Sequence, residues 1–122
     1  MAQHTTIGAQ GEDIAARFLL SKKYEILDRN YRCRHGEIDI IARRKNVLIF
    51  VEVKTRRSSA FGSPLEAVSL KKQRSISAVA QAYLQHSRLS GSAARFDVIA
   101  ILLGSGAPEI EHIENAFELP GY

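Results

Sequence analysis

The sequence predicts an α/β protein in which a mixed β-sheet is flanked by helices. Short segments rich in β-branched and aromatic residues alternate with polar turns, whereas two longer segments repeat apolar residues at helical spacing. One of the helical segments stands between two predicted strands, so it can return the chain to the same sheet as a right-handed crossover. A length of 122 residues and a hydrophobic content of 45% suit one core, and we expect a single domain over residues 1–122.

The first half of the chain is predicted to form a helix and three antiparallel strands. Thr6 or Gly8 opens the helix, which runs to about Lys22 because apolar positions recur every three or four residues. The strands are expected over residues 24–31, 36–43 and 47–55. The two-residue link Lys45-Asn46 makes the second and third strands a hairpin.

The second half is predicted to form a loop, a helix and two strands. Residues 56–62 have loop composition, and Ser63-Pro64-Leu65-Glu66 has the form of a capping box with proline at the first helical position. Helical structure is therefore expected from there to about Gln85, with a break near Ser69 as an alternative. Residues 95–103 are predicted as a buried strand and residues 109–117 as an edge strand.

Charge is distributed unevenly along the chain. The net charge is +4, but residues 1–85 carry 15 Lys and Arg against 8 Asp and Glu, which gives +7, while residues 86–122 carry 2 against 5, which gives −3. A basic surface of this kind is expected of a protein that binds the nucleic acid backbone. Many basic surfaces only keep a protein soluble, so composition leaves both explanations open.

Composition and the N-terminal sequence argue against an exported or membrane-spanning protein. The lone Cys33 cannot form an internal disulfide, which fits a reducing compartment. The N-terminus lacks the basic and apolar stretches of a signal peptide, and no apolar run approaches the length of a membrane span. We therefore expect a soluble cytoplasmic protein that has no membrane partner.

The predicted hairpin concentrates carboxylates and a lysine on its facing strands. Because side chains alternate along a strand, Glu37 and Asp39 share one face, and Glu52 and Lys54 share a face of the next strand. If Lys45-Asn46 is the turn, the numbers of paired residues sum to 91. This register places Asp39 opposite Glu52 and Glu37 opposite Lys54.

Two carboxylates that face each other across an antiparallel pair repel, so Asp39 opposite Glu52 asks for a compensating charge. Glu52 also lies in the apolar run Ile49–Val53, where an unpaired charge is expensive. A divalent cation such as Mg²⁺ resolves both problems, since it is commonly held by one or two carboxylates and takes phosphate oxygens as further ligands. The hairpin therefore predicts a metal site.

Two further residues join this prediction. Glu12 shares one helix face with three apolar residues at positions 15, 16 and 19, so it is a candidate third acidic group directed toward the sheet. Lys54 lies within reach of the same space and can hold a phosphate oxygen or orient the attacking water. The alternative is a solvated sheet face with cross-strand salt bridges such as Glu37 with Lys54, which is common in hairpins.

The segment HGEIDIIARRKNVLIFVEVKTR, residues 35–56, resembles the signature of the bacterial YraN-like family in the PD-(D/E)xK nuclease superfamily. The resemblance extends over nearly the whole chain, from GEDIAARFL through FGSPLEAVSLKKQ to RFDVIAI. It implies a restriction-endonuclease-like fold with an αβββαβ core, similar to that of Holliday-junction resolvases. The Pro-Asp pair usual in the superfamily is Ile38-Asp39 here, and the predicted metal site depends on Asp39 rather than on the proline.

The resemblance implies phosphodiester hydrolysis. The implied catalytic residues are Glu12, Asp39, Glu52 and Lys54, of which Asp39, Glu52 and Glu12 would bind one or two Mg²⁺ or Mn²⁺ ions, with the Val53 carbonyl as a further candidate ligand. The metal would lower the pKa of a bound water and polarise the phosphate. Lys54 would position the nucleophile or stabilise the developing charge. Glu37 either acts directly or holds Lys54, and Gln73 is a candidate to face the metal cluster from the second helix.

Basic residues around the predicted site are candidates for phosphate-backbone contacts without sequence readout. They are Arg34, Arg43, Arg44, Lys45, Arg56, Arg57, Lys71, Lys72 and Arg74. A solvated surface position is the alternative for each. Asp97 interrupts a buried strand, where it extends the acidic cluster, pairs with Arg95 or lies at the exposed end of the strand, and Phe61 is a candidate to stack on a base.

The function that the sequence favours is a metal-dependent endonuclease that hydrolyses structured or branched DNA in repair or recombination, with DNA preferred over RNA. Because fold and function separate, two alternatives stay open: a nucleic-acid-binding protein with an inert site, and a structural partner in a larger assembly. Resolvase-like enzymes cut two strands as dimers, so by analogy the C-terminal edge strand is a candidate surface for a homodimer.

Overall fold

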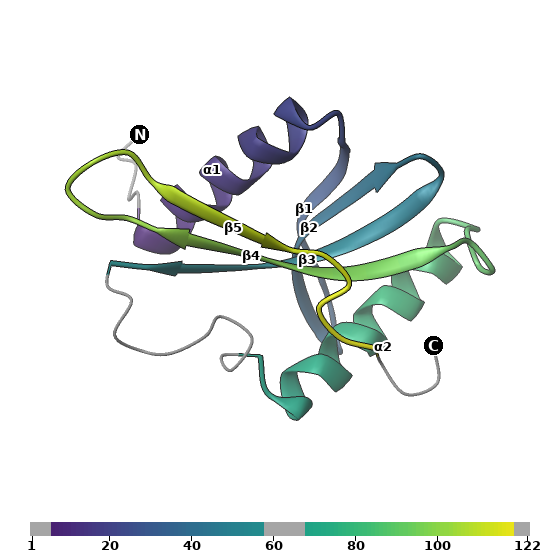
Figure 1. Cartoon of the computed structure of the whole chain (residues 1–122). Helices are drawn as coiled ribbons and strands as arrows, with labels where there is room; N and C mark the ends of the chain where they lie inside the picture. Colours follow the sequence, from purple (N-terminus) through teal and green to yellow (C-terminus); the bar gives the residue numbers. More distant parts are fainter. Residues whose placement is uncertain (1–5, 58–67, 119–122) are drawn as a thin grey trace, which may run out of the picture.

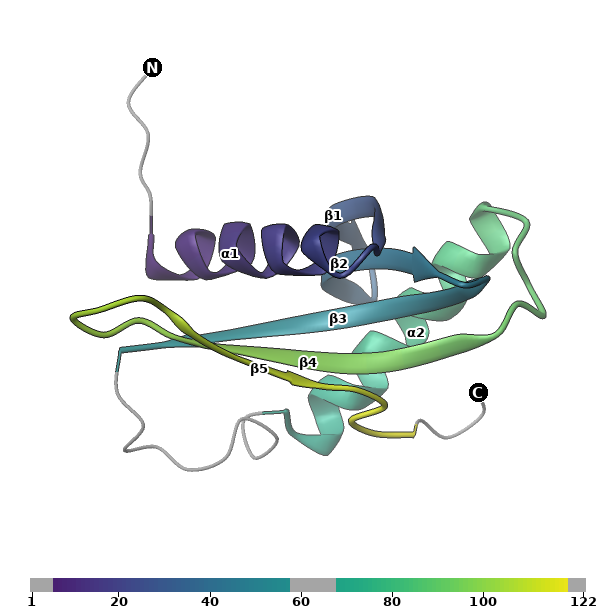
Figure 2. The ribbon, with the colours of Figure 1, turned by 45° about the horizontal axis from the view of Figure 1, so that its top comes forward.

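The computed structural model describes residues 6–57 and 68–118. The elements run in the order α1 (Ile7–Ser21), β1 (Glu25–Cys33), β2 (Gly36–Arg44), β3 (Val47–Arg56), α2 (Leu70–His86), β4 (Ala94–Leu102) and β5 (Glu109–Ile113). The strands form one sheet in the order β1-β2-β3-β4-β5 (Figure 1), in which β3 and β4 are parallel and the other neighbours antiparallel. Figure 2 shows α1 and α2 on opposite faces of this sheet. The predicted fold class is confirmed.

The first helix begins where the sequence predicts. Thr6 is the N-cap, and its hydroxyl oxygen accepts a hydrogen bond from the backbone N–H of Ala9 at 3.0 Å. The buried residues of α1 include Ala15, Ala16 and Leu19, the face that the apolar spacing indicates. The helix is therefore fixed at its start by a cap and along its length by one apolar face.

The second helix, α2, begins at Leu70. Ser69 is the N-cap of α2, with its hydroxyl oxygen accepting from the N–H of Lys72 at 3.1 Å, which agrees with the alternative of a break near Ser69. The proposed start at Ser63–Glu66 and the loop residue Phe61 lie outside the described residues. Neither α1 nor α2 is long and apolar enough to cross a membrane.

The β2–β3 hairpin has the predicted turn and register. Lys45 and Asn46 have φ values of 51° and 64°, so both central residues of the turn are left-handed, as a type I′ hairpin turn requires. The paired residues run from Arg44 with Val47 to Ile40 with Val51, and each pair sums to 91. Regular pairing ends there, one position before Asp39 and Glu52.

The core has two parts, one on each face of the sheet. Ile49 and Val51 of β3 belong to the part beneath α1, whereas Phe50 belongs to the part beneath α2. Because the side chains of a strand alternate, Glu52 and Lys54 project from β3 on the same side as Phe50. The fold thus directs this carboxylate and this lysine toward the side of the sheet that α2 covers.

The last strand is shorter than predicted, because β5 ends at Ile113 rather than near residue 117. Asn115 adopts a left-handed φ of 51°, and the chain then turns back so that the N–H of Ala116 donates to the carbonyl of Phe96 at 2.7 Å. The Phe117 ring stacks on Phe96 with the ring centroids 5.6 Å apart. The apolar residues at the end of the predicted strand therefore pack over β4 instead of extending β5, which does lie at the sheet edge.

Candidate active site

Asp39 and Glu52 meet where the β2–β3 hairpin opens. Beyond the last regular pair, Oδ2 of Asp39 accepts the backbone N–H of Val53 at 2.8 Å. The side chain of Asp39 is also hydrogen-bonded to that of Glu52. The predicted register placed these two carboxylates opposite each other, and in the structure they are in contact.

The carboxyl of Asp39 has an unusually high pKa. Burial raises it most, the negative charge of Glu52 raises it further, and the charge of Glu12 and the hydrogen bond with Glu52 act in the same direction. The N–H of Val53 stabilises the charged form and opposes this shift, but the pKa of Asp39 still reaches about 7. The pair therefore retains a proton at pH values at which an exposed aspartate has none.

Two lysine side chains contact the other partner of this pair. The Lys54 Nζ atom lies 3.2 Å from Oε2 of Glu52, and the Lys72 Nζ atom lies 3.7 Å from the same oxygen. Glu52 is only 6% exposed, whereas the side chains of Lys54 and Lys72 are 27% and 40% exposed, so the carboxylate is shielded from water while both lysines remain partly solvated. The sequence predicted Lys54 at this site, whereas it assigned Lys72 only a contact to the nucleic acid backbone.

A signal for Lys72 was present in the sequence. Lys72 stands one helical turn before Ile76 and two turns before Val79, both of which are buried against the sheet. A lysine on the apolar face of a helix, opposite a strand that carries a buried glutamate, calls for a partner. The helix spacing, read together with Glu52, would have identified this ion pair.

Glu12 is not grouped with Asp39 and Glu52 in the metal-free structure. Within residues 6–57 and 68–118, no group of three or more His, Cys, Asp or Glu side chains is placed to hold a metal ion. The side chain of Glu12 is instead hydrogen-bonded to Asn30 of β1, a residue with a left-handed φ of 53°. The role of Glu12 as a third metal ligand stays a prediction, and in the structure the charge of Glu12 acts on Asp39.

Burial raises the pKa of Glu12, with smaller contributions in the same direction from the charges of Glu37 and Asp13. The hydrogen bond from Asn30 and the charge of Arg29 favour the ionised form and reduce the shift without cancelling it. Glu12 is thus a second carboxylate near the hairpin whose charge is disfavoured by its surroundings.

Glu37 and Gln73 each have a partner that the sequence did not indicate. Glu37 forms an ion pair with Arg32, its neighbour on β1, so it does not hold Lys54. The reason is that residues 36–38 of β2 pair with β1 alone, since the pairing of β2 with β3 begins only at Ile40. The amide Nε2 of Gln73 donates to the carbonyl of Val68 at 3.0 Å, which connects the start of α2 to the preceding chain.

The predicted phosphate-contacting residues fall into two separate groups. The first group lies at the hairpin tip, roughly 13 to 20 Å along the strand from Asp39, and comprises Arg43, Arg44 and Lys45. Within it, Arg43 is paired with Glu25 at 2.9 Å, and Arg44 lies over the Tyr24 ring at 5.2 Å from its centroid. The second group comes from the β1–β2 turn, the end of β3 and the first turns of α2, with Lys72 in contact with Glu52, and comprises Arg34, Arg56, Arg57, Lys71, Lys72 and Arg74.

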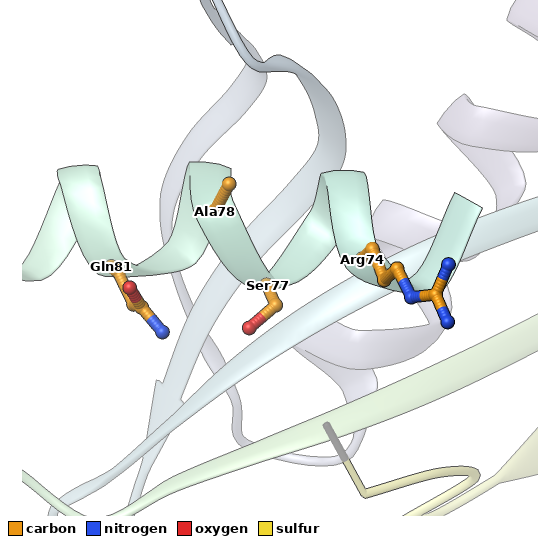
Figure 3. A pocket seen from close by; sticks show the side chains of 4 residues that line it. All are labelled: Arg74, Ser77, Ala78 and Gln81. Carbon is orange, nitrogen blue, oxygen red and sulfur yellow. The ribbon is translucent and has the colours of Figure 1, made fainter. Parts of the chain in front are cut away.

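A shallow hollow of about 280 Å³ lies along α2, lined by Arg74, Ser77, Ala78 and Gln81 (Figure 3). Ser77 is 6% exposed, and its hydroxyl is the one buried side-chain polar atom without a hydrogen-bond partner among the described residues. The hollow begins about half a helical turn beyond Lys72. It contains none of the predicted metal ligands, so it is distinct from the carboxylate pair.

Asp97 belongs to a separate buried cluster. Its Oδ1 accepts from Arg95 Nε at 2.9 Å and from the N–H of Asn115 at 3.0 Å, while Oδ2 lies 2.7 Å from His112 Nε2. Arg95 also donates to the hydroxyl of Tyr24 at 2.9 Å. Pairing with Arg95 was one of the three predicted alternatives. The contact with His112 was missed, because sequence spacing does not show that β5 brings this histidine over β4.

Asp39 and Glu52 suit a divalent cation. A buried carboxylate, Glu52, in contact with a partly buried one, Asp39, offers the hard oxygen ligands that Mg²⁺ prefers, and Mg²⁺ commonly needs only one or two of them because it keeps several waters. An αβββαβ core with Asp39 and Glu52-Val53-Lys54 at the opening of the β2–β3 hairpin defines a restriction-endonuclease-like protein.

The family assignment follows from comparison with known sequences. The model of the uncharacterised protein family UPF0102 matches residues 11–101, and the chain belongs to this family. UPF0102 is the YraN-like family that the sequence resembles, so the predicted resemblance is confirmed. A UPF0102 protein of Rhodococcus opacus is 50% identical over 118 residues, covering 96% of this chain and all of the relative. UPF0102 proteins of Geobacter sulfurreducens and Geotalea daltonii are 54% and 55% identical over 93% of this chain, and the match covers 89% and 91% of those proteins.

Proposed function

We propose that this protein is a metal-dependent endonuclease that hydrolyses phosphodiester bonds in structured or branched DNA. The observation that carries the proposal is the contact between Asp39 and Glu52 at the open end of the hairpin, with Lys54 against Glu52. Two buried carboxylates in contact are destabilising unless a cation or proton is shared between them. A catalytic divalent ion bound by both carboxylates would be the cation that this pair requires.

The residues divide the work as follows. Asp39 and Glu52 would hold the ion, and the Val53 N–H fixes the orientation of the Asp39 carboxylate. A bound Mg²⁺ or Mn²⁺ would supply Lewis acidity and an activated water. The Lys54 ammonium, already 3.2 Å from Glu52, is positioned to stabilise negative charge that develops on the phosphate. Glu12 adds negative charge close to Asp39 without being placed as a ligand.

Exposed basic residues on α2 and in the β1–β2 turn support nucleic acid as the substrate class. Lys71 and Arg74 are exposed on α2, and Arg34 is exposed in the β1–β2 turn. Contacts of this kind neutralise phosphates without reading sequence, which suits an enzyme that selects DNA by its structure.

Cleavage assays with site variants test the proposal. Wild-type protein is incubated with branched, single-stranded and linear DNA, and with RNA, in Mg²⁺ or Mn²⁺, beside Glu52→Ala and a control, Glu109→Ala, on the exposed edge strand. We expect cleavage of branched DNA by the wild type and by Glu109→Ala, and its loss in Glu52→Ala. If the wild type cuts no substrate that Glu52→Ala leaves intact, the enzymatic proposal is wrong; DNA binding retained by both would then favour a non-catalytic nucleic-acid-binding protein.

A further inference from the structure

The carboxylate of Glu52 is shared by two ammonium groups that come from different elements. Lys54 lies two residues along β3, whereas Lys72 approaches from the first turn of α2. Both contact Oε2, at 3.2 Å and 3.7 Å. The side of Glu52 that faces α2 is therefore filled with positive charge, and Asp39 lies on the hairpin side.

The charges around Glu52 resemble those of a two-metal site in which a lysine ammonium stands in place of one of the two ions. In two-metal phosphodiesterases, two ions about 3.5 to 4 Å apart stabilise the attacking and leaving oxygens from either side. Here Asp39 and Glu52 offer a place for one ion, and the position next to Glu52 where a second positive charge would be expected is taken by the Lys72 ammonium.

Counting formal charges leads to the same result. With Glu12, Asp39 and Glu52 ionised, the two lysines leave the site with a charge of about −1, and one divalent ion changes this to about +1. A phosphodiester, with one negative charge, then makes the site neutral. A second divalent ion would instead leave about two positive charges uncompensated in a partly buried position, which is costly.

We propose that Lys72 is an active-site residue that replaces a second divalent cation, so that the site operates with one ion. This inference rests on the proposed nuclease function. In the metal-free protein the Lys72 ammonium neutralises Glu52, and with DNA present it contacts a non-bridging oxygen of the phosphate. Lys72 forms no covalent bond and transfers no proton; it contributes charge alone.

A Mn²⁺ titration tests this inference without measuring cleavage. We expect one ion per chain in the wild type, and about tenfold tighter binding in Lys72→Met, because the ammonium no longer competes for Glu52. Lys71→Met is the matched control, since Lys71 is the neighbouring lysine and is exposed. It should bind Mn²⁺ as the wild type does. Two ions in the wild type, or unchanged affinity in Lys72→Met, would overturn the role of Lys72 while leaving the nuclease proposal intact; no Mn²⁺ binding at all would overturn both.

The cleavage step gives a second, opposite readout. At saturating DNA, Lys72→Met should lower the single-turnover rate about 100-fold although it binds Mn²⁺ more tightly, and Lys72→Arg should recover much of the rate because it restores the charge. Thermal unfolding of the metal-free variants establishes that they are folded. If the Lys72–Glu52 ion pair were purely structural, Lys72→Met would change the Mn²⁺ affinity, the thermal stability and the cleavage rate in the same direction. That result would contradict the proposal.

Discussion

The protonation of Asp39 connects the carboxylate pair to the stability of the metal-free protein. Its pKa is raised to about 7, so folding favours the protonated form, and this contribution to stability is complete below the ordinary aspartate pKa and is lost as the pH rises through about 7. Asp39→Asn keeps an oxygen for the Val53 N–H and an amide that donates to Glu52. We expect it to stabilise the metal-free protein at pH 8 by about 2 to 4 kcal/mol.

Urea unfolding in EDTA at pH 5 and pH 8 measures this effect. The difference between Asp39→Asn and the wild type should be small at pH 5 and large at pH 8. Added Mn²⁺ serves as an internal control, since it should stabilise the wild type at pH 8 and have little effect on the variant. A variant less stable than the wild type at pH 8 in EDTA would show that Asp39 is ionised and already satisfied in the folded protein.

Asp97 shows the opposite behaviour of a buried carboxylate. Burial alone would raise its pKa, but hydrogen bonds from His112, Arg95 and the Asn115 backbone, together with the charge of Arg95, outweigh burial and lower it. Its contribution to stability is therefore present above the ordinary aspartate pKa and is lost as the pH falls below that value. Asp97→Asn presents an amide N–H group to donors and should destabilise the protein by about 3 to 5 kcal/mol at pH 7.

The measurement for Asp97 is chemical unfolding between pH 3 and pH 7. The gap between Asp97→Asn and the wild type should narrow in acid. Asp28→Asn, a change on the exposed part of β1, is the control and should stay within about 0.5 kcal/mol of the wild type. A constant gap over the whole range would mean that the lowered pKa of Asp97 does not contribute to folding.

At the level of elements, the position of α1 depends on one close contact. Gly11 is buried in α1, and a Cβ atom added there would lie 1.8 Å from Oγ1 of Thr55 on β3. In an open helix, Gly→Ala usually stabilises by about 0.5 to 1 kcal/mol. Here Gly11→Ala should destabilise by about 1 to 3 kcal/mol, since the helix must move away from the sheet.

The control for this contact is in the same helix. At Gly8 an added Cβ would meet only Oγ1 of Thr6, at 3.9 Å, so Gly8→Ala should be neutral or stabilising. Thermal unfolding of the two variants provides the comparison. Because Glu12 follows Gly11 directly, Gly11→Ala should also lower cleavage more than Gly8→Ala does. Equal stability of the two variants would show that α1 is not held by its contact with Thr55.

The hairpin shows how far local sequence can predict the site. Its turn and register follow from the left-handed preference of Asn46 and from strand alternation, so the contact of Asp39 with Glu52 was predictable. Three features were not, because they depend on strand separation or on the packing of distant elements. Glu37 turns to Arg32 where β2 leaves β3, Glu12 is held by Asn30, and His112 reaches Asp97 across the last two strands.

For the whole molecule, the fold places the acidic and the basic parts of the sequence at different sides, which predicts the side from which DNA approaches. The acidic C-terminal region forms β5 and the turn after it, along the edge of the sheet beside β4. The exposed basic residues Arg34, Lys71 and Arg74 lie instead on the β1–β2 turn and on α2. Because the acidic edge repels phosphates, we expect DNA to approach from the α2 side, where Lys72 and Glu52 face each other.

This geometry predicts which lysines and arginines contribute to DNA binding. Removing one side chain that neutralises a phosphate should reduce the slope of log affinity against log salt concentration by about 1. We expect Lys71→Ala with Arg74→Ala to reduce the slope by about 2. Arg44→Ala with Lys45→Ala, at the hairpin tip roughly 17 to 20 Å from Asp39, should leave it nearly unchanged for a short DNA. Fluorescence anisotropy with a catalytically inactive Glu52→Ala background measures both; equal reductions of the slope would place the DNA along the hairpin instead of along α2.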